Sequence, residues 1–104
     1  MAKYHYLYKI TNKITQEYYY GVHSTDNLKD YYFGSGAALK DNIRRYGLEN
    51  FEKETLEFFP SRKDMMNEER RMVNKDLLKD PKCLNVILGG RRIKRKRWAE
   101  MCDR

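Results

Sequence analysis

The sequence predicts an α+β fold in which helices flank a small three-stranded antiparallel sheet. Three observations carry this prediction: strand-like alternation in a tyrosine-rich N-terminal segment, two later segments with helical periodicity, and one β-rich segment between them. The predicted order is β-β-α-β-α followed by a basic tail. A length of 104 residues leaves room for a single domain, which we place at residues 1–90, with the tail at 91–104.

The N-terminal segment is expected to form an antiparallel β-hairpin over about residues 4–22. Aromatic or apolar side chains occupy every second position of its first half, namely Tyr4, Tyr6, Tyr8 and Ile10. The letters TNKITQ then supply turn residues, and EYYYGV is rich in strand formers. Residues 24–36 contain two glycines and predict a loop.

A first helix is expected over about residues 37–46. Its apolar residues share one face: Leu39, Ile43 and Tyr46. Gly47 is placed as the left-handed residue after the helix end. The segment FEKETLEFF then alternates and stops at a proline, which predicts a third strand near residues 52–59.

A second helix is expected from a cap at Ser61 to about Leu78. One face of this helix is apolar: Met65, Met66, Met72, Val73 and Leu77. Glu69 projects near the centre of that face, whereas Glu68 lies at its edge. A carboxylate in such a place is costly unless it is paired or bound to a metal, so Glu69 either forms a salt bridge with a basic residue or points into a functional site. The residues that follow, 81–90, predict a short buried segment.

The positive charge is concentrated at the C-terminal end of the chain. Residues 91–104 contain seven basic and two acidic residues, and so carry +5 of the net charge of +7. A run such as RRIKRKRW neutralises phosphates and releases condensed counterions. We therefore expect it to bind nucleic acid, the alternative being a solvated tail that aids solubility. The basic residues concerned are Arg91, Arg92, Lys94, Arg95, Lys96 and Arg97.

Cysteine usage and hydropathy favour a cytosolic protein. Cys83 and Cys102 belong to no CxxC pair and accompany no histidine cluster, so we expect reduced thiols rather than a disulfide framework or a zinc site. No apolar run approaches the length of a membrane span, and the first residues do not form a secretory signal. We expect a cytoplasmic location and no membrane partner.

Two tyrosine triplets on the predicted hairpin resemble the motif of the GIY-YIG nuclease family. They are Tyr6-Leu7-Tyr8 and Tyr19-Tyr20-Gly21. The family follows them with a basic helix, a helix that carries a metal-binding glutamate, here Glu69 in ERRMV, and an asparagine in a short apolar segment, here Asn85 in LNV. The match covers about residues 4–90. The letters YYGVHST and YFGSG also resemble a phage-borne, homing-endonuclease-like branch of the family.

This resemblance implies a DNA endonuclease that hydrolyses phosphodiester bonds with one divalent cation, Mg²⁺ or Mn²⁺. Glu69 would hold the metal, with waters completing its coordination. Tyr8 would take a proton from the attacking water, which requires neighbouring positive charge to lower its pKa from the usual value of about 10. Tyr19 would contact the phosphate or orient the water, and Asn85 would be a hydrogen-bonding support close to Glu69.

The cation that balances charge in the transition state is not fixed by the resemblance. Lys29, in the predicted loop, occupies the position where the family usually has an arginine. His23, Lys40 and Arg44 are the candidates. We expect His23 to hydrogen-bond a tyrosine hydroxyl, and Lys40 and Arg44 to reach over the sheet edge from the first helix. Together with Arg45, these two residues would also contact DNA.

Two other functions remain open. A nucleic-acid-binding protein of the same fold that is catalytically weak or inactive also accounts for the basic tail and the aromatic strands. A structural or regulatory protein that binds another protein through the hairpin leaves Glu69 and the tail unexplained. For an endonuclease on double-stranded DNA, the short tail predicts that specificity is low or is supplied by a homodimer or a partner. We expect it to act in the cytoplasm of a bacterium or a phage-infected cell.

Overall fold

The computed structural model describes residues 2–85 and confirms the α+β fold with a three-stranded antiparallel sheet. The sheet order is β2-β1-β3, so the first strand is the central one. The elements are β1 (Tyr4–Asn12), β2 (Tyr18–Thr25), α1 (Ala37–Tyr46), the 3-10 turn η1 (Leu48–Asn50), β3 (Phe51–Phe59), α2 (Arg62–Met72) and α3 (Lys75–Leu78). The predicted basic tail lies outside the described residues. Within residues 2–85, no helix combines the length and the hydropathy needed to cross a bilayer.

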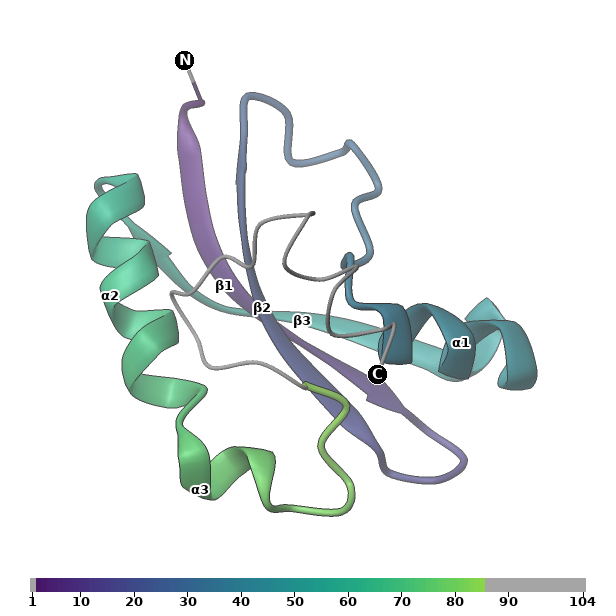
Figure 1. Ribbon diagram of the computed structural model, residues 1–104. Coiled ribbons are helices and arrows are strands. Elements are labelled where there is room, and N and C mark those ends of the chain that lie inside the picture. The colour runs from purple at the N-terminus through teal and green to yellow at the C-terminus, as the bar shows by residue number, and fades with distance from the viewer. Residues whose placement is uncertain (1, 86–104) are drawn as a thin grey trace, which may run out of the picture.

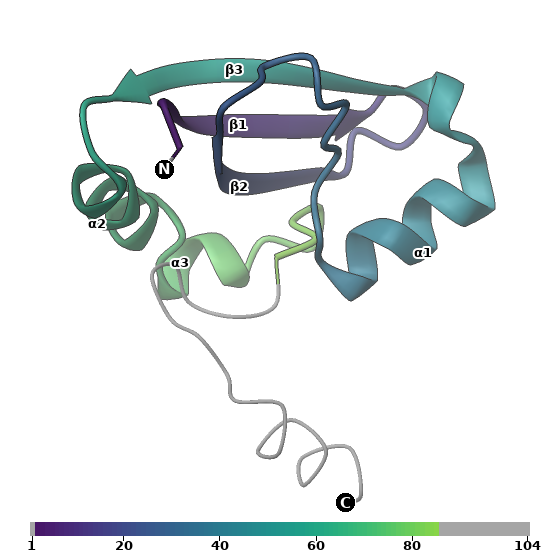
Figure 2. The same cartoon turned by 90° about the horizontal axis from the view of Figure 1, so that it is seen from above.

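The two faces of the sheet are covered by different elements. Figure 1 shows α1 on one side of the strands and α2 on the other. Seen from above, the connection from β2 to α1 runs across the strands towards β3 (Figure 2). On the α1 side the buried core is Tyr6, Tyr8, Ile10, Leu39 and Phe51. On the α2 side, the buried residues are Leu7 of β1, Met65 of α2, and Val73 at the C-terminal end of α2.

A buried asparagine joins the hairpin turn to α1. Asn12, at the end of β1, is fully buried. Its Oδ1 accepts hydrogen bonds from the backbone N–H groups of Ile14 (2.9 Å) and Thr15 (3.2 Å). Its Nδ2 donates to Oδ1 of Asn42 in α1 at 2.8 Å, and Asn42 donates in turn to Glu17 at 3.0 Å. These bonds satisfy polar groups that would be costly to bury alone.

The first helix has its predicted bounds, but its end differs in conformation. Gly47 has φ 90° and ψ 135°, so it takes the positive φ expected of a glycine without the left-handed helical ψ. The chain therefore turns into η1, after which β3 begins one residue earlier than predicted.

The predicted second helix is interrupted, and the expectation of one helix to Leu78 is wrong. The cap at Ser61 is confirmed, because its Oγ accepts the Asp64 N–H at 3.2 Å. However, α2 ends at Met72, and Asn74 caps a new short helix by accepting the Leu77 N–H at 3.0 Å. Asparagine side chains compete with helical hydrogen bonds in this way, which explains the break.

The segment after α3 pairs with the outer edge of β2. Cys83 forms a parallel bridge with Tyr18, and the Leu84 N–H donates to the Tyr18 carbonyl at 2.7 Å. Residues 83–85 are partly buried, so the predicted buried segment is less enclosed than expected, and its residues 86–90 lie outside the described part. At the opposite edge, β3 exposes three glutamates: Glu52, Glu54 and Glu57.

Asn12→Ala should lower the free energy of unfolding by about 2–3 kcal/mol, because it removes the hydrogen bond to the buried Asn42 and those to two backbone N–H groups of the turn. Urea unfolding measures this change. Asn67→Ala, the same substitution at an exposed position of α2, should leave the free energy of unfolding within about 0.5 kcal/mol of the original value. Equal unfolding midpoints for the two variants would contradict the structural role of Asn12.

Candidate functional site

The register of the hairpin brings the two motif tyrosines together on one sheet face. Tyr8 pairs with Gly21, and Ile10 pairs with Tyr19, so Tyr8 and Tyr19 point to the same side. Their ring centroids are 6.3 Å apart. A Cβ on Gly21 would lie 2.3 Å from the Tyr8 hydroxyl oxygen. The glycine of the second triplet is therefore needed to make room for the tyrosine of the first.

Burial makes Tyr8 a poor base. Its side chain is 1% exposed. Burial raises the pKa of Tyr8 above its usual value, and the nearby Tyr32 and Tyr19 side chains and a hydrogen bond with Tyr32 add to this effect. We expected neighbouring positive charge to lower this pKa, and the structure shows the opposite direction. Tyr8 therefore keeps its proton near neutral pH and acts as a hydrogen-bond donor.

Glu69 is coupled to Tyr19 through its charge. Burial is the main cause that raises the pKa of Tyr19, the nearby Tyr32 adds to it, and the negative charge of Glu69 raises it further. Hydrogen bonds with the Ser35 side chain and the Gly36 backbone act in the other direction. Glu69 is partly buried on the same helix as Met65. Its effect on Tyr19 is that of a carboxylate directed towards the motif tyrosines.

Glu68 lies on a different side of α2, as predicted. Its Oε1 accepts from Nε of Arg71 at 3.0 Å, and the two side chains form an ion pair one turn apart. The hydrogen bond with Arg71 lowers the pKa of Glu68. Because Glu68 is engaged on its own helix, it provides a matched comparison for Glu69.

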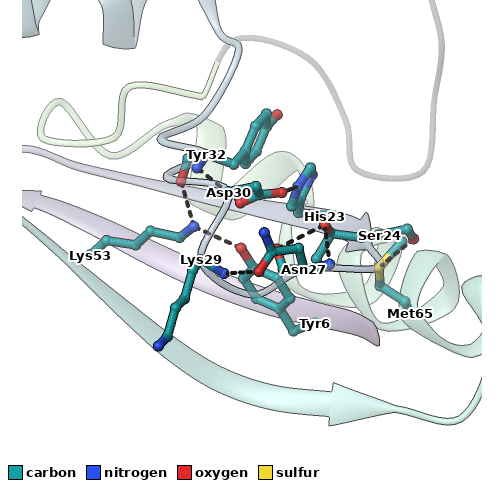
Figure 3. A network of polar contacts seen from close by, with 10 residues as sticks. Tyr6, His23, Ser24, Asn27, Lys29, Asp30, Tyr32, Lys53 and Met65 are labelled. Atoms are coloured by element: carbon teal, nitrogen blue, oxygen red, sulfur yellow. Dashed lines mark hydrogen bonds and ion pairs between the residues drawn. The ribbon is translucent and has the colours of Figure 1, made fainter. Parts of the chain in front are cut away.

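His23 pairs with a carboxylate, so the expected bond to a tyrosine hydroxyl is wrong. Its Nε2 lies 2.7 Å from Oδ2 of Asp30, and its ring stacks on Tyr32 at 3.7 Å between centroids (Figure 3). The hydrogen bond with His23 is the main cause that lowers the pKa of Asp30 to about 2, assisted by the Tyr32 N–H and the Thr25 hydroxyl. The reason for the difference is that the connection after β2 folds back over the sheet and brings Asp30 to His23.

Lys53 is the cation that the structure places among the tyrosines, and the sequence did not single it out. Its Nζ donates to the Tyr6 hydroxyl at 2.7 Å and to the Tyr32 carbonyl at 2.5 Å. It also lies 5.0 Å from the ring centroids of both Tyr6 and Tyr8. Burial lowers the pKa of Lys53, against the opposing effect of Asp30. A signal was present in the sequence, because the alternation of FEKET puts Lys53 on the face of Phe51.

The predicted basic residues of α1 lie on its outer surface. Lys40, Arg44 and Arg45 are exposed. Arg44 and Arg45 interact with Asp41 of the same helix, with Nη1–carboxylate distances of 3.3 and 3.9 Å. Arg44 and Arg45 therefore engage their own helix, and all three side chains are open to solvent.

Asn85 supports β2. Its Nδ2 donates to the Tyr20 carbonyl at 2.7 Å, and its Oδ1 accepts the Tyr20 N–H at 2.9 Å. This amide therefore acts as an extra rung at the edge of the strand that carries Tyr19. The predicted phosphate contacts of the tail, Arg91, Arg92, Lys94, Arg95, Lys96 and Arg97, lie outside the described residues.

The donor set suits a hydrated Mg²⁺ better than a metal enclosed by protein ligands. Over residues 2–85, no group of three or more histidine, cysteine, aspartate or glutamate side chains could hold a metal ion. Mg²⁺ is commonly bound by one or two carboxylates and keeps several waters. Glu69, partly buried and near Tyr19, is a ligand of that kind.

Comparison with known proteins finds similar proteins that are named endonucleases. No protein-family model matches the chain, and no solved structure matches it. Proteins of Enterobacteria phage T4 are similar to it. "Putative endonuclease segC" is 49% identical over 88 residues, which are 85% of this chain and 44% of that protein. "Putative endonuclease segB" is 48% identical over 87 residues, 84% of this chain and 39% of that protein. "Endonuclease segA" is 42% identical over 88 residues, 85% of this chain and 40% of that protein. Most of this chain is thus similar to proteins named endonucleases, although it spans less than half of the length of each.

Proposed function

We propose that this chain is the cleaving domain of a metal-dependent DNA endonuclease of the GIY-YIG type. The observation that carries the proposal is the meeting of three distant motif residues: Tyr8 and Tyr19 lie 6.3 Å apart between ring centroids, and the charge of Glu69 acts on Tyr19. The endonuclease names of the similar phage proteins support the same activity. A phage-infected host cell would be the place of action.

The proposed reaction is hydrolysis of a phosphodiester bond. Water attacks phosphorus, the bond to the 3′ oxygen breaks, and that oxygen gains a proton. A bound Mg²⁺ or Mn²⁺ would neutralise phosphate charge and make water a better nucleophile. Glu69 would hold the cation through its carboxylate. Negative charge develops on the phosphate oxygens, so the remaining groups of the site must donate hydrogen bonds or carry positive charge.

The tyrosines and Lys53 meet that requirement. The raised pKa values of Tyr8 and Tyr19 keep both phenols protonated. We therefore assign to Tyr8 the donation of a hydrogen bond to Tyr32, in place of the proton-accepting role that the family resemblance implies. Lys53 places an ammonium 5.0 Å from the Tyr8 ring centroid, and so supplies the positive charge expected of His23, Lys40 or Arg44.

Duplex DNA is the proposed partner. Lys40, Arg44 and Arg45 offer an exposed basic surface on α1, and the sequence of the tail adds six closely spaced basic residues. Contacts to phosphates hold a protein on DNA without reading its sequence. Sequence preference would then come from a homodimer or from another partner.

Glu69→Gln should abolish cleavage of supercoiled plasmid while DNA affinity stays within about threefold, because it removes the metal ligand and leaves the basic surfaces in place. Gel electrophoresis after incubation with Mg²⁺, with and without EDTA, measures cleavage. Glu68→Gln should cleave at nearly the original rate, because Glu68 pairs with Arg71 on the side of α2.

The same assay separates the alternatives. A plasmid that shifts on a gel but stays intact with the unmodified protein would identify a binding protein without cleavage. Loss of cleavage in Glu68→Gln but not in Glu69→Gln would contradict the assigned metal ligand.

Replacing the six closely spaced basic residues of 91–97 with glutamine should make DNA binding less dependent on salt. If about four of them reach phosphates, the slope of log affinity against log salt concentration should flatten by roughly 3–4 units. The matched variant replaces Lys40, Arg44 and Arg45 with glutamine. A slope that changes only in this second variant would place the DNA on α1 and not on the tail.

The pH dependence of cleavage tests the role of Tyr8. Because burial raises the pKa of Tyr8, the phenol stays protonated below pH 10, and its ionisation should not shape the rate profile between about pH 6 and 9. Tyr8→Phe should therefore lower the rate at every pH in this range without changing the form of the profile. Tyr4→Phe, at a partly exposed position outside the site, should have no effect. A rate that rises about tenfold per pH unit in the unmodified protein but not in Tyr8→Phe would restore Tyr8 as the base.

A further inference from the structure

Tyr32, in the connection between β2 and α1, is held at three points. Its N–H donates to Oδ1 of Asp30 at 3.1 Å. Its carbonyl accepts from Nζ of Lys53 at 2.5 Å. Its ring lies parallel to His23, with 3.7 Å between centroids and 4° between planes. Figure 3 shows the three contacts converging on this residue. Such fixation is unusual for a residue in a long connection, where side chains are generally mobile.

Tyr32 belongs to a tyrosine cluster, which we define as Tyr6, Tyr8, Tyr19 and Tyr32, because the rings of the other three all contact Tyr8. The rings of Tyr32 and Tyr8 meet edge to face, with centroids 6.0 Å apart. The hydrogen bond between them favours the protonated form of Tyr8, which is the effect expected when Tyr8 donates. The Tyr32 oxygen then accepts, and its own O–H is left to donate to another group. A donor that also accepts a hydrogen bond is polarised and donates more strongly.

Exposure distinguishes Tyr32 from Tyr8. Tyr8 is 1% exposed, whereas Tyr32 is only partly buried. The cluster therefore reaches the surface through Tyr32. The neighbouring Tyr31 has a different place: it is 90% exposed and has a positive φ of 58°, so its ring projects away from the cluster into solvent.

We propose that the Tyr32 hydroxyl donates a hydrogen bond to a non-bridging phosphate oxygen of bound DNA. The inference rests on the proposed function, because it takes DNA as the ligand. No covalent bond changes in this contact. The hydrogen bond with Tyr8 orients the Tyr32 hydroxyl. The Nζ of Lys53 lies 5.5 Å from the Tyr32 ring centroid and adds positive charge beside an anionic ligand. Hydrogen bonds to charged groups are stronger than neutral ones, which gives the contact a measurable effect.

Tyr32→Phe tests the proposal, because it removes only the hydroxyl and keeps the ring that stacks on His23. Each variant is made in a Glu69→Gln background, so that duplex DNA with Mg²⁺ present is bound and not cut. We expect Tyr32→Phe to lose about ten- to hundredfold in affinity at fixed salt. Tyr31→Phe, the same change one residue earlier, should keep the affinity of the background protein. Thermal unfolding followed by circular dichroism checks that both variants are folded at the assay temperature.

The outcomes decide separately on the contact and on the activity. A loss confined to Tyr32→Phe supports the contact, even if the protein with Glu69 restored cuts no plasmid, in which case only the proposed cleavage fails. Equal affinities for Tyr32→Phe, Tyr31→Phe and the background protein would overturn the contact while leaving the plasmid assay to judge cleavage. Absence of DNA binding by the background protein would overturn the inference, and plasmid cleavage by the unmodified protein would then show whether the proposed function survives it.

Discussion

The packing of Tyr8 against Gly21 is the constraint on which the site depends. An added Cβ would lie 2.3 Å from the Tyr8 hydroxyl oxygen, so no other residue fits opposite this phenol without movement. The pairing of Tyr8 with Gly21 also fixes the hairpin register, because a slip of one residue would turn every side chain of β2 to the other face. Tyr19 then lies beside Tyr8, and the connection after β2 brings Tyr32 into contact with Tyr8.

Burial favours the uncharged form of the ionisable side chains at this site. It raises the pKa values of Tyr6, Tyr8 and Tyr19, and it lowers that of Lys53. The phenols are therefore neutral, and the Lys53 ammonium group lies 5.0 Å from the ring centroids of Tyr6 and Tyr8. Asp30, whose charge acts on Tyr6 and Lys53, is engaged by His23. Phenolic donors next to a cation favour the binding of an anion, and the phosphate of a nucleic acid is an anion that the basic tail also favours.

Local patterns in the sequence predicted most of the fold and only part of the site. The hairpin, α1 and β3 follow from periodicity and turn residues that act over a few positions. The break before α3 depends on one side chain, Asn74, whose capping bond competes with a helix-favouring sequence. Lys53 and Tyr32 were missed because they meet only when the connection crosses the sheet, 21 residues apart in the chain. The raised pKa of Tyr8 depends on burial by several segments, so it could not be predicted from the motif.

The two borders of the sheet have consequences for self-association. The outer border of β2 is paired with Cys83 and Leu84 and is bonded by Asn85, so little of it is available to another strand. The outer border of β3 carries the exposed Glu52, Glu54 and Glu57. Two copies that approached through β3 would bring these like charges together, which is a known protection against sheet-to-sheet aggregation. Over residues 2–85, the helices and the connections are therefore the surfaces better suited to a symmetric dimer, which leaves the strands to serve as a rigid support for the phenols.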